Sequence, residues 1–134
     1  MKLIVEKHRE LDQKLKKYSN GVLGLQDNWD HQGSKGYNGK TWQRVVKLLE
    51  KTLNTLWDEK LEIPIPLILP ASNGSFDINW ETEQFELLVN IPSDFKELVN
   101  LYGEKIGFPE DEIEVRINYN LVDLVLIEWL KTIL

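Results

Sequence analysis

The sequence predicts an α+β domain in which an antiparallel sheet of about three to four strands is covered by helices. Two stretches within residues 74–91 carry apolar residues at every second position, on either side of a polar turn. These are Phe76, Ile78 and Trp80 in the first stretch and Phe85, Leu87, Val89 and Ile91 in the second. A period of two places such side chains on one face of a strand, so residues 74–91 predict a half-buried antiparallel hairpin. Apolar residues in the first sixty positions recur with the period of a helix instead, and those helices would cover the hairpin.

The length and composition fit a single domain spanning residues 1–134. With 134 residues, 42% hydrophobic and 28% charged, the chain is long enough for one core. It contains no cysteine, which excludes disulfides, zinc–thiolate sites and thiol nucleophiles. It has neither the apolar run of a signal peptide nor one that would span a bilayer. A cytoplasmic location without a membrane partner is therefore expected.

The charge is unevenly distributed along this acidic chain. Residues 1–60 hold 12 basic and 8 acidic side chains, a net of +4, and residues 61–134 hold 4 and 14, a net of −10. The two halves give the overall charge of −6. Because phosphate neutralisation supplies most of the affinity for nucleic acid, an acidic chain is not expected to have a nucleic-acid partner.

Two helices separated by a long loop are predicted for the first 58 residues. The first helix has an apolar stripe at alternating steps of three and four and is expected to end near Ser19, before Asn20-Gly21. The second is expected to run from Thr41, a good N-cap, to about Asp58. Residues 21–40 between them contain five of the eight glycines and no periodicity, so they predict a loop.

An extended segment and a third helix are predicted on either side of the hairpin. Three prolines between residues 61 and 72 exclude a helix there and indicate an extended segment. After the hairpin, Pro92-Ser93-Asp94 resembles a helix start. The buried stripe of that helix would consist of Phe95, Leu98, Val99 and Tyr102.

A strand followed by a helix is predicted for residues 112–134. Ile113, Val115, Ile117 and Tyr119 alternate with polar residues after an acidic turn at residues 109–112, and a helix is expected from about Asn120. Its polar positions leave an apolar arc of half the circumference or more, so this helix is either deeply buried or half of an interface. The predicted interface residues are Val122, Val125, Leu126, Trp129 and Ile133. A strand at LVLIEW stays open, because periodicity alone does not exclude it.

The glycine-rich residues 27–41 contain two candidate sites. SKGYNGKT, residues 34–41, differs from the phosphate-binding loop only in having Ser34 at the first glycine, and Lys40 and Thr41 would contact phosphate and magnesium. However, no apolar strand pattern precedes it and the chain lacks βαβ alternation. Asp27, Asp30 and His31 are the candidates for a metal site, but their spacing fails the calcium-loop pattern. Accordingly, no metal or cofactor is expected.

Residues 23–91 resemble a loose family of small uncharacterised prokaryotic proteins. The shared pattern is an N-W-D-x-x-G loop, a helix, a proline-containing extended segment, a turn glycine and a strand ending in tryptophan. In this chain those features are Asn28-Trp29-Asp30 with Gly33, the helix from Thr41, Pro66 and Pro70, Gly74, and Ile78-Asn79-Trp80. The family has no assigned activity, so the resemblance implies a shared fold and no catalytic residues.

Together these patterns favour a non-enzymatic, adaptor- or antitoxin-like domain that binds a protein partner or a second copy of itself. The wide apolar arc of the last helix and the absence of a recognisable catalytic set support this hypothesis. The alternative is a small enzyme, or a nucleotide- or metal-binding protein, that uses the loop 27–41.

Overall fold

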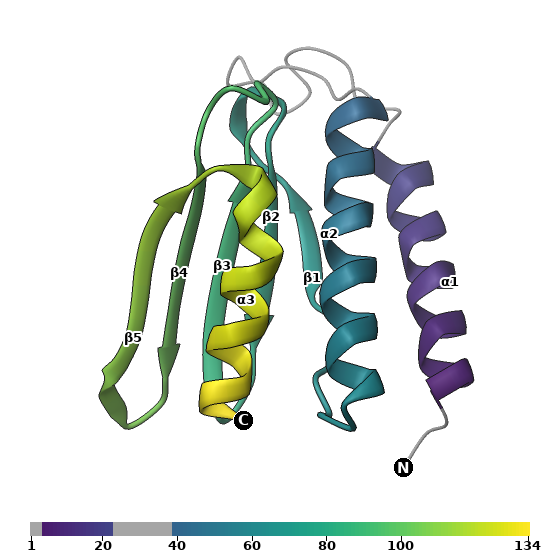
Figure 1. Cartoon of the computed structure of the whole chain (residues 1–134). Helices are drawn as coiled ribbons and strands as arrows, with labels where there is room; N and C mark the ends of the chain where they lie inside the picture. The colour runs from purple at the N-terminus through teal and green to yellow at the C-terminus, as the bar shows by residue number, and fades with distance from the viewer. Residues whose placement is uncertain (1–3, 23–38) are drawn as a thin grey trace.

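The structure is a computed structural model that describes residues 4–22 and 39–134 (Figure 1). It is an α+β fold with three helices and an open antiparallel sheet. In chain order the elements are α1 (Ile4–Val22), α2 (Gly39–Asp58), β1 (Leu67–Pro70), the short 3-10 turn η1 (Ser72–Gly74), β2 (Phe76–Glu81), β3 (Phe85–Ile91), β4 (Val99–Lys105), β5 (Phe108–Ile117) and α3 (Tyr119–Ile133). The prediction of α+β is confirmed, and the predicted strand count of three to four is corrected to five among the described residues.

The sheet is a meander in which every strand pairs antiparallel with its neighbour in sequence, in the order β1-β2-β3-β4-β5. The predicted hairpin is confirmed as β2 and β3, with Ile78 opposite Val89 and Trp80 opposite Leu87. The alternating side chains of both strands lie on one buried face, as the period of two predicts. We call this the inner face of the sheet.

The predicted helix after Pro92 is wrong, because residues 99–105 form β4 between β3 and β5. Val99 and Leu101 are buried on the inner face, whereas Phe95, which was predicted to be buried, is 73% exposed. Two physical causes explain the strand. Gly103 and Gly107 weaken a helix there, and Gly107, with φ of +85°, adopts the left-handed conformation in the tight connection to β5.

The last strand is longer than predicted, and the last helix is confirmed. β5 begins at Phe108, so the acidic residues 110–112, predicted as a turn, lie within the strand. LVLIEW is part of α3, so the choice left open between strand and helix is settled as helix. Because β5 ends at Ile117 and α3 begins at Tyr119, the prediction of Tyr119 as a strand residue is wrong. At the other end of the chain, α1 continues to Val22 and α2 starts at Gly39. Residues 23–38 of the predicted loop lie outside the described residues.

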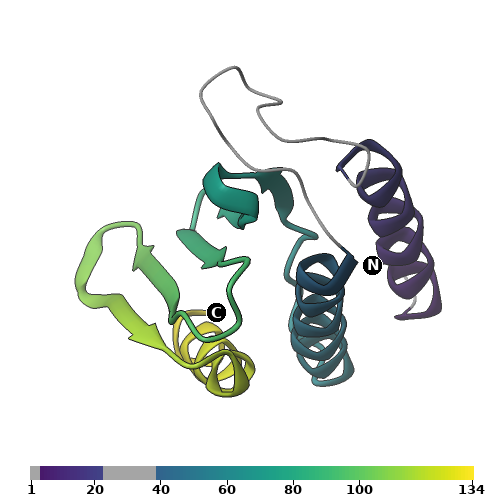
Figure 2. The same ribbon diagram turned by 90° about the horizontal axis from the view of Figure 1, so that it is seen from above.

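The helices form a layer on the inner face of the sheet. α2 and α3 contact each other and the sheet, and α1 packs on α2, at the opposite end of the molecule from β5 (Figure 2). Leu53 and Leu56 of α2 are fully buried together with Trp80 and Phe85 of the sheet, as one apolar cluster. None of the described elements covers the outer face of the sheet, where alternate residues of β3 are exposed.

Within the described residues, no helix combines the length and the apolar character that crossing a membrane requires.

Candidate functional site

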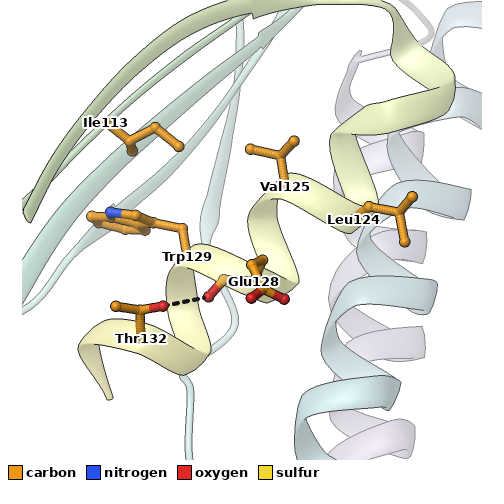
Figure 3. A pocket seen from close by; sticks show the side chains of 6 residues that line it. All are labelled: Ile113, Leu124, Val125, Glu128, Trp129 and Thr132. Carbon is orange, nitrogen blue, oxygen red and sulfur yellow. Dashed lines mark hydrogen bonds between the residues drawn. The ribbon is translucent and has the colours of Figure 1, made fainter.

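An apolar groove lies between α3 and the edge strand β5 (Figure 3). Its volume is about 490 Å³, and it opens widely to the surface. The lining residues are Ile113 from β5 and Leu124, Val125, Glu128, Trp129 and Thr132 from α3. Glu128 is the one charged side chain among them, so the groove offers a mainly apolar surface. We call it the α3–β5 groove.

Trp129 forms the floor of the groove and holds α3 against the sheet. Its indole Nε1 donates a hydrogen bond of 2.8 Å to the backbone carbonyl of Asp111 in β5. Its ring lies against Gly103 in β4, where a side chain would leave no room for it. Phe85 in β3 meets the same ring edge-on, with centroids 6.2 Å apart. A single side chain of α3 therefore contacts three adjacent strands.

Large apolar side chains are exposed on α3, both at the rim of the groove and one turn before it. Leu124 is 61% exposed and Leu121 is 48% exposed, whereas Val125 is partly buried. Four of the five interface residues predicted from the sequence, Val122, Leu126, Trp129 and Ile133, are instead buried within the chain. This corrects the predicted interface, because the sheet already occupies that side of α3. The apolar surface left to a partner consists of Leu121, Leu124 and the exposed part of Val125.

The first two turns of α3 are fixed to α2 by polar contacts. The hydroxyl of Tyr119 donates a hydrogen bond of 2.7 Å to the backbone carbonyl of Arg44. The Arg44 guanidinium lies 5.7 Å from the centre of the Tyr119 ring and donates hydrogen bonds to the carbonyls of Pro92 and Ser93. One turn further on, the buried Asp123 carboxylate forms an ion pair of 2.6 Å with Lys51. These contacts position the helix that carries the groove.

Burial raises the pKa of Tyr119 above its usual value, and the nearby Arg44 charge offsets part of that shift. The folded state therefore favours the neutral phenol, and this contribution to stability is complete below about pH 10, the usual tyrosine pKa. It is lost as the pH rises above that value through the higher folded pKa.

Tyr119→Phe should lower the free energy of unfolding at pH 7 by roughly 0.5–1.5 kcal/mol, because the hydrogen bond to the Arg44 carbonyl is lost. The stability of the variant should then fall less steeply than that of the wild type as the pH rises above about 10, the usual tyrosine pKa. Urea unfolding at a series of pH values measures both effects. Identical slopes for the two proteins would contradict the assignment.

The candidate nucleotide site has unsuitable surroundings in the described part of the chain. Lys40 is exposed in the first turn of α2, but Thr41 is only 1% exposed, which does not suit a magnesium ligand. All five strands pair antiparallel, whereas a phosphate-binding loop connects a strand of a βαβ unit to its helix. This arrangement does not support phosphate binding by Lys40 and Thr41.

The candidate metal residues Asp27, Asp30 and His31 lie outside the described residues. Across residues 4–22 and 39–134, no three His, Cys, Asp or Glu side chains come together in a way that would hold a metal ion.

A second exposed surface is the outer face of the sheet. Glu81, Glu86 and Glu104 lie directly opposite one another across β2, β3 and β4. Like charges opposite one another destabilise a sheet. Leu88 and Tyr102 form an adjacent cross-strand pair and are 39% and 38% exposed. Among the described residues this face is acidic and partly apolar.

The sequence pattern singled out α3 as the candidate interface helix but missed its exposed apolar residues. Leu121 and Leu124 belong to the same wide apolar arc as the buried residues, and only the docking of α3 separates the two sets. The signal available in the sequence was that α3 has more apolar positions than one buried face needs, which predicts that some of them are exposed.

Comparisons of the chain with family models, with curated proteins and with solved structures found no match. The resemblance based on the N-W-D-x-x-G loop therefore stays a prediction, and residues 28–33 lie outside the described part of the chain.

Proposed function

We propose that this chain is a non-enzymatic protein-binding domain, of the adaptor or antitoxin kind, whose binding surface is the α3–β5 groove. The observation that carries the proposal is the exposure of Leu124 beside a mainly apolar groove. Contiguous exposed apolar surface on a small protein commonly marks a site of protein interaction. Burying such surface against a partner stabilises the complex by about 25 cal/mol per Å² before the costs of association.

The shape of the groove favours an elongated apolar partner. It is bounded by a helix on one side and a strand on the other, and it is wide open rather than enclosed (Figure 3). Such a surface fits a helix or strand from another chain better than a small molecule, whose surface is usually almost fully buried in its pocket. A partner would contact Leu124 and the exposed part of Val125, beneath which the buried Trp129 ring forms a rigid floor.

Leu124→Lys should abolish capture of the partner while leaving the domain folded. Leu124 is 61% exposed, so a lysine there places a charge in the interface but leaves the core unchanged. The measurement is affinity capture from native lysate with the tagged protein at low and high salt, read by mass spectrometry. One stoichiometric protein is expected with the wild type at both salt concentrations, since an apolar interface is not screened.

The matched control is Leu69→Lys in β1, at a leucine that is 43% exposed on the outer face. This variant should capture the same protein as the wild type. Capture that survives Leu124→Lys, or the absence of any captured protein, an untagged copy of this chain included, would contradict the proposed surface.

A further inference from the structure

The strand β5 forms a free edge of the sheet beside the α3–β5 groove. It is ten residues long, and no strand in the described part of the chain lies beyond it. Its inner-face residues Ile113, Val115 and Ile117 are only partly buried. The opposite edge strand, β1, has four residues, ends in Pro70 and follows two further prolines, which impair pairing. A long, partly apolar edge such as β5 can instead pair with another strand.

We infer that two copies of this chain associate by antiparallel pairing of β5 with β5 about a two-fold axis at Val115. This inference rests on the proposed function and names the partner as a second copy. In this register Val115 lies opposite itself, and Ile113 of each copy lies opposite Ile117 of the other. On the outer face, Glu114 of each copy lies opposite Arg116 of the other. The pairing therefore gives apolar contacts on one face and two opposite-charge pairs on the other.

Neighbouring registers are less favourable because of the charge sequence along β5. A slip of one residue would place inner-face side chains opposite outer-face ones, so only pairings of a residue with itself are compatible with both faces. A two-fold axis at Ile113 would place Glu112 of one copy opposite Glu114 of the other. An axis at Glu114 or at Arg116 would place that residue opposite the same residue of the second copy, which again brings like charges together. Centring on Ile117 pairs Arg116 with the neutral Asn118 and so forms no charge pair. Among these centres, only Val115 both avoids like charges and forms two opposite-charge pairs.

The groove provides room for the second copy of α3. Trp129 contacts β4 at Gly103 and β5 at Asp111, so α3 lies beneath these two strands. Strands lie about 4.8 Å apart. A two-fold axis between the two β5 strands would therefore place the two α3 helices about 10 Å apart, which is close to the usual packing distance of helices. Val125, which lies on the Ile113 side of α3 in each copy, would then face the second helix (Figure 3).

The test uses the full chain and two charge reversals, Glu114→Arg and Arg116→Glu, with sedimentation equilibrium as the readout. The wild type should show a concentration-dependent shift toward twice the mass of one chain. Each single variant places like charges opposite one another at both pairs, so its self-association should weaken by at least about tenfold. Circular dichroism confirms that both variants remain folded, since residues 114 and 116 are exposed.

Mixing the two single variants should restore association. One variant then carries two positive side chains at positions 114 and 116 and the other carries two negative ones, so the mixed pair has opposite charges at both places. The double variant Glu114→Arg/Arg116→Glu should also associate like the wild type. Glu86→Arg on β3 and Lys16→Glu on α1 make the same charge changes away from the edge and should have no effect.

Three results would overturn the inference: a wild type that stays monomeric at every concentration, single variants that associate like the wild type, or a mixture that stays monomeric. The proposed function is tested separately from the self-association, by the capture experiment. A monomeric chain that still captures a different protein through Leu124 would remove the second copy as partner and leave the groove as a binding surface. A monomeric chain that captures nothing would remove both.

Discussion

Replacing Trp80 with alanine should lower the free energy of unfolding by about 3–5 kcal/mol, a large part of the stability of a domain of this size. The Trp80 side chain is 1% exposed and lies on the inner face of β2, opposite Leu87 of β3. Alanine would leave a large cavity where the sheet meets the helices. It would also leave the carbonyl of Pro64, which accepts a hydrogen bond of 2.7 Å from the indole Nε1, without this partner.

Urea unfolding followed by far-UV circular dichroism measures the decrease in the free energy of unfolding. Trp80→Phe fills most of the cavity but cannot donate the hydrogen bond, so it should cost less than Trp80→Ala and separate packing from hydrogen bonding. The matched surface control is Leu67→Ala on the adjacent strand, where the leucine is 48% exposed and the expected loss is below about 1 kcal/mol. If Trp80→Ala cost no more than Leu67→Ala, the central position of Trp80 in the core would be wrong.

The elements predicted from the sequence are those whose apolar period is local and complete. The hairpin of β2 and β3 carries seven alternating apolar residues, and its pattern alone fixes which face is buried. The stripe of α2 is similarly uninterrupted from Trp42 to Trp57, and the predicted end at Asp58 is confirmed. Such segments need no information from the rest of the chain.

Strand β4 was missed because its period is interrupted by a residue that has no side chain. Its inner face presents Val99, Leu101 and then Gly103, so the alternation is visible for only two apolar positions. Phe95, Leu98, Val99 and Tyr102 meanwhile satisfy a helical spacing by coincidence. The reason for a glycine at position 103 lies 26 residues away at Trp129, and no local pattern contains it.

The candidate site depends in the same way on tertiary packing. The sequence shows that α3 has more apolar residues than one buried face requires, which predicts a second contact surface. It does not show that Trp129 turns toward β4 and β5 and leaves Leu124 outside, since that depends on where the sheet ends. The helix could therefore be predicted as a binding element, but its exposed residues could not.

Gly103→Ala should lower the free energy of unfolding by about 1–3 kcal/mol, although it adds a single methyl group to a strand. A Cβ atom at this position would lie 2.7 Å from Cη2 of Trp129 and 3.0 Å from Cδ1 of Leu87. The indole cannot move away at low cost, because its Nε1 is bonded to the carbonyl of Asp111 and its ring contacts Phe85. Alanine would otherwise favour a strand slightly over glycine, so a loss isolates the steric conflict.

A double-mutant cycle with Trp129→Phe tests this cause directly. Phenylalanine lacks the outer ring atoms that meet position 103, so Gly103→Ala should cost at least about 1 kcal/mol less in that background than in the wild type. Gly39→Ala, at a glycine with nothing within 4 Å of the added atom, is the control and should not destabilise the chain. If the changes in the free energy of unfolding caused by Gly103→Ala and Trp129→Phe were additive, the proposed contact between the two positions would be contradicted. Coupling would show that the absence of a side chain at Gly103 sets the position of Trp129, and thereby the depth of the α3–β5 groove that a partner would enter.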